Sequence, residues 1–146
     1  MADMLSPTRL YELATSRLSL LVPVVYVMGL FALSSVPGTV DPAMGAIPTV
    51  FIWVPPNLQN ALHVPVFGML AWLWCWSLRS WTGRFAIRLT AAAGLAGLYA
   101  VTDEWYQSTV PGRFASLGDL ALNLIGIALG LSLAAALARR RRRLGR

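Results

Sequence analysis

Charged side chains are scarce in this sequence, and their scarcity excludes an ordinary soluble domain. Of its 146 residues only 12% are charged, half of the roughly 25% that soluble domains carry. Hydrophobic residues make up 57%, and the mean hydropathy is +0.62. Lysine is absent, so all twelve basic residues are arginine. The composition predicts an integral membrane protein.

Cysteine and histidine are equally rare. Cys75 is the single cysteine, so no disulfide can form within the chain, and its place in an apolar run is typical of a small apolar helix residue. His63 is the single histidine. One histidine with carboxylates would suit a divalent ion, but no second ligand follows at a metal-binding spacing. The sequence therefore predicts no metal site and no cofactor.

Long apolar runs dominate what is present. Runs of about 20 residues cross a hydrocarbon core of ~30 Å at 1.5 Å per residue. The first run is too long for a signal peptide and lacks an A-x-A cleavage site. We predict an all-α, polytopic membrane protein in which residues 1–146 form one domain, a four-helix transmembrane bundle. The predicted spans cover residues 18–36, 61–78, 85–102 and 117–138, after an interfacial helix near 7–17 and before a basic tail at 139–146.

The arginines predict the orientation of these spans. Four spans place both termini on one side of the membrane, together with eleven of the twelve arginines. Arg113 alone falls on the other side, with Asp41, Asp103 and Glu104. The positive-inside rule then predicts cytoplasmic termini, and outward loops at 37–60 and 103–116. The tail is explained by orientation and by contact with anionic lipid, so no nucleic-acid partner is expected. The expected location is a bacterial cytoplasmic (inner) membrane.

Polar residues near the span ends converge on the outer face. The second and fourth spans begin there and the third ends there, whereas random placement would scatter polar groups between both faces. A charged group at membrane depth costs roughly 2.5–3.5 kcal/mol, so it needs a compensating role. The predicted site contains His63, Asp103, Glu104, Gln107, Arg113, Asp119 and Asn123.

The stretch from Thr102 to Gly130 resembles the closing motif of the VanZ-like family, namely D-E-x-x-Q, then P-x-R, then D-x-x-x-N-x-x-G. Further similarity lies in segment 62–67, around His63, and in segment 34–38, which ends the first helix. Gln59-Asn60 replaces the Asp-Lys of many members, and Phe67 stands where they often have tyrosine. A mechanism that needs that carboxylate or that phenol is therefore not expected here. The residues in register are Asp103, Glu104, Gln107, Pro111, Arg113, Asp119, Asn123 and Gly126.

The resemblance implies a membrane protein of the cell envelope. The family is named for a member associated with resistance to teicoplanin, a glycopeptide that acts outside the membrane. Implied partners are membrane lipids and either a lipid-linked envelope precursor or a glycopeptide. The resemblance implies architecture more specifically than chemistry.

Three interpretations of the polar residues stay open. In an enzyme, His63 would move protons and Asp103 or Glu104 would serve as acid or base, while Arg113 would grip a phosphate or carboxylate. In a non-catalytic binder or regulator, the same groups would recognise a headgroup or an antibiotic. In a scaffold, Arg113 would pair with Asp119 or Glu104 and lock the helices together. The remaining polar residues, Gln107 and Asn123, would orient a substrate or cap helix ends.

Overall fold

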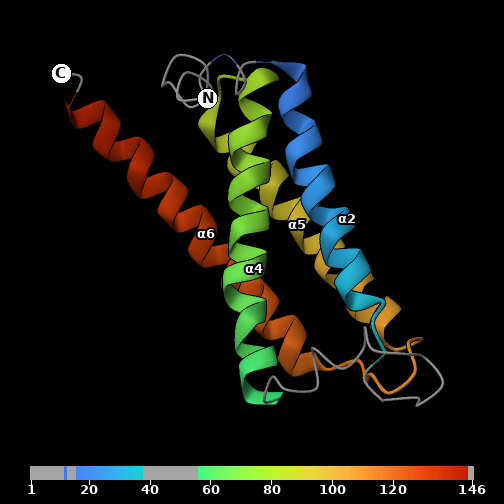
Figure 1. Cartoon of the computed structure of the whole chain (residues 1–146). Helices are drawn as coiled ribbons and strands as arrows, with labels where there is room; N and C mark the ends of the chain where they lie inside the picture. Colours follow the sequence, from blue (N-terminus) through green and yellow to red (C-terminus); the bar gives the residue numbers. More distant parts are fainter. Residues whose placement is uncertain (1–11, 13–15, 38–55, 145–146) are drawn as a thin grey trace, which may run out of the picture.

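The computed structural model describes residues 12, 16–37 and 56–144, which form an all-α bundle (Figure 1). A short 3-10 helix, η2 (Arg17–Leu20), leads into α2 (Leu21–Ser34). Then follow α4 (Pro56–Ser77) with η4 (Leu78–Ser80), α5 (Phe85–Gln107) and α6 (Leu117–Leu144). Four helical segments, the first formed by η2 and α2 together, are long and apolar enough to cross a membrane. The predicted all-α class and the prediction of four long apolar helices are thereby confirmed.

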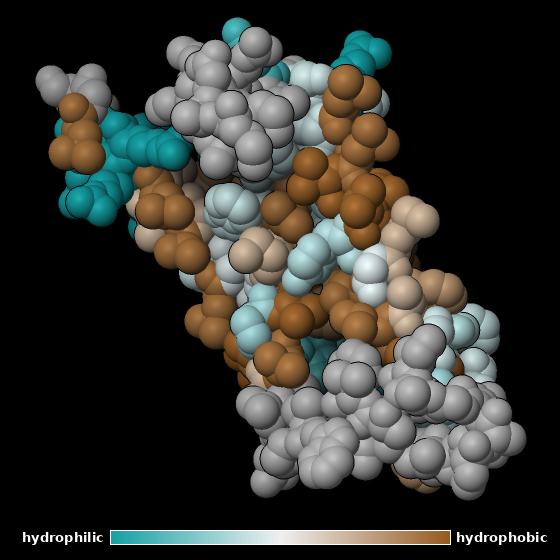
Figure 2. All heavy atoms as spheres, viewed as in Figure 1, coloured by the Kyte–Doolittle hydropathy of each residue, from teal (hydrophilic) through white to brown (hydrophobic). Residues whose placement is uncertain are grey.

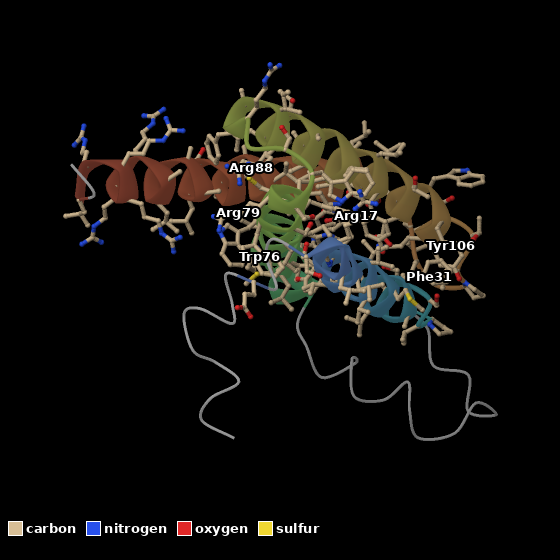
Figure 3. All side chains as sticks on the ribbon, turned by 90° about the horizontal axis from the view of Figure 1, so that it is seen from above. Arg17, Phe31, Trp76, Arg79, Arg88 and Tyr106 are labelled. Carbon is tan, nitrogen blue, oxygen red and sulfur yellow. The ribbon has the colours of Figure 1, made fainter. Side chains whose placement is uncertain are left out.

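The helices alternate in direction. The start of α2, the end of α4 and the end of α6 lie at the top of Figure 1, and the α5–α6 connection lies at the bottom. Arg17, Arg79 and Arg88, which come from η2, η4 and α5, gather at the top end, as the view from above shows (Figure 3). Most of the predicted interfacial helix near 7–17 and most of the predicted outer loop, with Asp41, lie outside the described residues.

The helix ends differ from the predicted spans in a way that matters for the site. α5 continues to Gln107, whereas the sequence predicted an end at Thr102. Asp103, Glu104 and Gln107 are therefore helical, and each is buried, with no more than 7% of its surface exposed. The helix can continue through these polar residues because most of their side-chain polar atoms have hydrogen-bond partners in α5 itself, in α2 or in the α5–α6 connection.

The other two differences extend helices at their polar ends. α4 begins at Pro56, which has no N–H to lose in a first helical turn, rather than at Ala61. α6 continues to Leu144, so Arg139 to Arg143 are helical and form its last turns rather than a separate tail. Cations at a helix C-terminus interact favourably with the helix dipole.

α4 is the central helix and contacts α2, α5 and α6. Its side chains Phe67, Leu70 and Ala71 lie at the heart of the core. α5 meets this surface with small residues spaced four apart, which let helix backbones approach closely in a membrane. The core members from the other helices are Leu30 of α2, Ala96 and Ala100 of α5, and Ile127 of α6.

Glycines allow the backbones of α4 and α6 to lie very close together where the two helices cross. A Cβ added to Gly126 would lie 3.0 Å from the Val64 Cα and closer still to the Val64 carbonyl oxygen. A Cβ on Gly130 would lie 2.9 Å from the Gly68 Cα. The Gly126-x-x-x-Gly130 pattern, which is typical of close helix contact, thus lies against α4.

Apolar side chains cover much of the outside of the bundle. Figure 2 shows brown surface along α2 and along the edge formed by α6, while the C-terminal end of α6 is teal. Leu129, Leu133 and Leu137 of α6 are all exposed, and beyond its crossing with α4 this helix extends away from the other three (Figure 1). An exposed apolar surface of this kind is suited to lipid acyl chains.

Candidate functional site

The polar residues near the α5–α6 connection divide into two groups. We call the first the Asp103 network and the second the Glu104 cluster. The Asp103 network comprises Ser34, Tyr99, Asp103, Gln107 and Arg113. The Glu104 cluster comprises His63, Glu104, Asp119 and Asn123. All seven residues predicted for the site lie in one group or the other.

Asp103 is held by donors from its own helix. Tyr99 Oη donates to Asp103 Oδ1 (3.3 Å), and Gln107 Nε2 donates to Asp103 Oδ2 (2.9 Å). Both donors lie four residues away, which is the spacing that brings side chains onto one helix face. Gln107 Nε2 also donates to Ser34 Oγ at 3.4 Å, so the network reaches α2. Both carboxylate oxygens of the buried Asp103 are thereby satisfied.

Arg113 joins the same network to the end of α2. Its Nε donates to the Val36 carbonyl at 2.9 Å, and its Nη2 lies 3.4 Å from the Leu33 carbonyl. Its Nη1 donates to Gln107 Oε1 at 3.3 Å. Leu33 lies in the last turn of α2, and its carbonyl also accepts the Val36 N–H at 3.2 Å, whereas Val36 follows the helix. Arg113 therefore adds donors at a helix end, where carbonyls lack the N–H groups of a continuing helix. Within the described residues Arg113 bonds no carboxylate, so the pairing with Asp119 or Glu104 imagined for a scaffold does not occur there.

A tight turn aims Arg113 at α2. The Arg113 N–H donates to the Val110 carbonyl at 3.1 Å, closing a turn over Pro111 and Gly112. Gly112 has φ 74°, the left-handed value that a type II turn requires at its third residue. Pro-Gly is a typical turn sequence, and here it returns the chain toward α2.

Glu104 faces the start of α6. Ser116 caps this helix, because its Oγ accepts the N–H groups of Gly118 (3.1 Å) and Asp119 (3.3 Å). The Ser116 N–H in turn donates to Glu104 Oε1. In a capping box the acidic residue three positions into the helix, here Asp119, would accept that N–H. Glu104 of α5 takes this role instead.

One oxygen of Glu104 is left over. Glu104 is 7% exposed, and its Oε2 is buried without a hydrogen-bond partner among the described residues. Glu104 interacts electrostatically with Asp119, His63 and Asp103. A buried acceptor left unpaired costs ~1–3 kcal/mol, so it marks either stored strain or a place for a ligand.

Asn123 and His63 connect α6 to α4. His63 Nδ1 lies 2.8 Å from Asn123 Oδ1. Since an amide oxygen only accepts, Nδ1 carries the proton, and in a neutral ring Nε2 then presents its lone pair. Asn123 is fully buried, at 0% exposed, and its Nδ2 has no partner in the described chain. His63 is half-buried, and its ring lies beside that of Phe67, with centroids 6.3 Å apart.

Asp119 lies half-buried in the first turn of α6. A carboxylate there interacts favourably with the positive end of the helix dipole. Its backbone N–H is held by Ser116, while no hydrogen bond to its carboxylate is found among the described residues. Asp119 therefore adds an available acceptor beside Glu104.

Three contributors were not predicted as site members. Tyr99 precedes Asp103 by four residues, so the helical spacing alone could have identified it. Ser34 and Ser116 are brought in by tertiary packing, as an acceptor for Gln107 and as the cap of α6.

The chemistry of the two groups differs accordingly. The Asp103 network is internally satisfied and joins α2, α5 and the connection to α6. The Glu104 cluster contains three polar groups without a hydrogen-bond partner in the described chain: Glu104 Oε2, the Asn123 Nδ2 amide and His63 Nε2. No three His, Cys, Asp or Glu side chains in that part of the chain are grouped to hold a metal ion.

Comparison with known proteins gives one match. A sequence model described as VanZ/LLP1 matches residues 6–138, which include every residue of both polar groups. Neither the curated proteins nor the solved structures gave a match.

Proposed function

This chain belongs to the VanZ/LLP1 family, and from that membership we propose that it binds the polar headgroup of a membrane lipid or of a lipid-linked envelope precursor. The Glu104 cluster is the proposed binding site. The observation that carries the proposal is the pair of buried, unpartnered polar atoms, Glu104 Oε2 and Asn123 Nδ2, near the end of a bundle of candidate membrane spans. A ligand that enters from the lipid could pair with both atoms.

We propose that this end of the bundle faces the outside of a bacterial cytoplasmic membrane. Support comes from the basic residues gathered at the opposite end: Arg17, Arg79, Arg84, Arg88 and the helical run Arg139 to Arg143. Such an excess favours the cytoplasmic side. Headgroups of the outer leaflet and lipid-linked intermediates of wall synthesis would then be at the depth of the Glu104 cluster.

Thiol labelling tests this orientation. In a Cys75→Ala background, we expect Ser108→Cys to react with a membrane-impermeant maleimide in intact cells, because Ser108 is exposed beside the α5–α6 connection. Gly83→Cys, at the exposed turn between α4 and α5, should react only after the cells are permeabilised. The reverse pattern would place the Glu104 cluster at the cytoplasmic face and overturn the proposed location.

Copurification tests the binding function. Wild-type protein extracted with mild detergent is expected to retain a lipid or lipid-linked precursor above its abundance in the bulk membrane, as measured by mass spectrometry. Glu104→Gln should lose this enrichment at unchanged protein level, because it removes the charge of the unpartnered carboxylate. Glu12→Gln, the matched change at the chain's other glutamate, should keep it. Equal retention by Glu104→Gln would argue against binding at this cluster.

Catalysis is the second candidate function, and the proximity of His63 to Glu104 favours it. An imidazole and a carboxylate can transfer a proton to or from a bound group. The two serines of the α5–α6 connection have other hydrogen bonds: Ser116 caps α6, and Ser108 donates to the Trp105 carbonyl at 2.6 Å. A hydrolytic reaction here would therefore use water as the nucleophile, and would convert a retained lipid in wild type but not in His63→Gln.

A role in teicoplanin resistance follows from the family only through this same site. If this member confers it, we propose that the bound headgroup belongs to the material on which the glycopeptide acts. Loss of Glu104 or His63 would then restore sensitivity in cells that contain normal amounts of the protein.

A further inference from the structure

We propose that the headgroup bound by the Glu104 cluster presents a protonated primary amine, with an oxygen acceptor close to it. This inference rests on the proposed binding function and narrows its ligand. It differs from the expectation that Arg113 would hold a phosphate or a carboxylate.

Arg113 is not available for an anion. Its Nε, Nη1 and Nη2 are directed to the Val36 carbonyl, Gln107 Oε1 and the Leu33 carbonyl. No other arginine lies near the α5–α6 connection in the described chain, since the rest belong to the opposite end. A phosphate would thus meet carboxylates without a free cation to offset its charge.

The local charge favours a cation. Asp103, Glu104 and Asp119 contribute three negative charges when ionised, against one positive charge from Arg113. Two negative charges remain in excess while His63 is neutral, and one when it is protonated. Interactions between charges are stronger near a low-dielectric boundary than in water, so this excess attracts a cationic group.

The free hydrogen-bonding atoms are mostly acceptors. Glu104 Oε2 is buried without a partner, and Asp119 has no partner for its carboxylate in the described chain. The geometry of the Asn123 contact leaves His63 Nε2 as a third acceptor in the neutral ring. A primary ammonium has N–H donors for such acceptors, whereas a trimethylammonium has none.

Asn123 supplies the complementary feature. Its Nδ2 is a buried donor without a partner in the described chain and needs an acceptor. An ethanolamine-type headgroup carries its oxygen two carbons from the nitrogen, and amino sugars and aminoacyl groups also place oxygen near an amine. The cluster therefore fits an amine together with a nearby oxygen better than an isolated cation.

Lipids that differ only in the amine test the inference. Purified wild-type protein is titrated with phosphatidylethanolamine or phosphatidylcholine of identical acyl chains, and binding is followed by native mass spectrometry and thermal stabilisation. We expect phosphatidylethanolamine to bind roughly tenfold more tightly, because charge-assisted hydrogen bonds require an N–H. The preference should disappear in Glu104→Gln, weaken in Asp119→Asn and persist in Glu12→Gln.

Further measurements distinguish a soluble amine from a lipid-linked one, and they test the amine separately from the proposed headgroup binding. Competition by free ethanolamine would show that a soluble amine suffices. Its failure, together with a Glu104-dependent preference for phosphatidylethanolamine, would show that the amine must be lipid-linked. Equal binding of both lipids to wild type, or a Glu104-dependent preference for phosphatidylglycerol, would overturn the amine. The latter would leave headgroup binding intact. Absence of any Glu104-dependent lipid binding would overturn both proposals.

Discussion

Gly126→Ala should destabilise the protein by about 3 kcal/mol, although alanine is the better helix former. The added Cβ would lie 3.0 Å from the Cα and carbonyl carbon of Val64 and closer still to its oxygen. These are backbone atoms, which cannot rotate away as a side chain does, so α4 and α6 must separate. The measurement is thermal unfolding of purified protein in one detergent, with wild type and variant compared at equal concentration.

Gly94→Ala is the matched control. Gly94 lies within α5, and a Cβ there would meet nothing within 4 Å. The same substitution should therefore stabilise by up to ~1 kcal/mol, since glycine in a helix interior is less favourable than alanine. If Gly126→Ala were as stable as Gly94→Ala, the close α4–α6 crossing would be wrong.

The crossing also holds the candidate site together. Gly126 is one helical turn from Asn123, and its contact, Val64, adjoins His63. Separation of the helices at Gly126 would lengthen the 2.8 Å hydrogen bond between His63 and Asn123. Gly126→Ala protein that remains in the membrane should therefore also bind headgroups less tightly. Its binding residues are unchanged, but the α4–α6 packing that positions the His63 imidazole is altered.

Much of the architecture could be predicted from the sequence. The four apolar runs gave the spans, and the even number of spans brought the polar residues of separate helices to one end. Helical spacing correctly placed Gln107 with Asp103, and it placed Asn123 one turn inside Asp119. These features depend on local periodicity and on the number of membrane crossings, and both can be read directly from the sequence.

The division of the site into two groups could not be predicted in the same way. Asp103 and Glu104 were treated as one pair of carboxylates because the third span was expected to end before them. Neighbouring residues in a helix point about 100° apart, so Asp103 faces α2 while Glu104 faces α6. Which helix lies in each direction depends on how α5 is rotated in the bundle, and periodicity does not contain that information.

The role of Arg113 depends on a turn and a distant helix end. The sequence predicted the turn at Pro111-Gly112 but not its direction. The carbonyls that Arg113 meets belong to Leu33 and Val36, which lie far away along the chain, at and just beyond the end of α2. The sequence therefore predicted a ligand-binding role for Arg113, whereas its hydrogen bonds in the structure link the α5–α6 connection to the end of α2.

The separation of the polar residues into two groups can be tested by comparing Asp103 with Glu104. These neighbours accept the same isosteric change, from carboxylate to amide. Asp103 accepts one donor on each oxygen, from Tyr99 and from Gln107. Asparagine keeps only one acceptor oxygen, so Asp103→Asn removes the acceptor of either Tyr99 or Gln107 and leaves that donor with its longer contact, to the Val27 carbonyl (3.5 Å) or to Ser34 Oγ (3.4 Å). We expect a loss of ~1–3 kcal/mol in the free energy of unfolding, and a loss near the upper end for Asp103→Ala.

Glu104→Gln should behave differently. Its remaining oxygen can still accept the Ser116 N–H, and the atom that becomes NH₂ has no native hydrogen bond to lose among the described residues. We therefore expect wild-type stability together with lost headgroup binding, whereas Asp103→Asn should bind in proportion to the protein that stays folded. Thermal unfolding and lipid binding measured on the same samples provide the test. A loss of stability in Glu104→Gln equal to that in Asp103→Asn would assign Glu104 to the scaffold, and the proposed binding site would then be wrong.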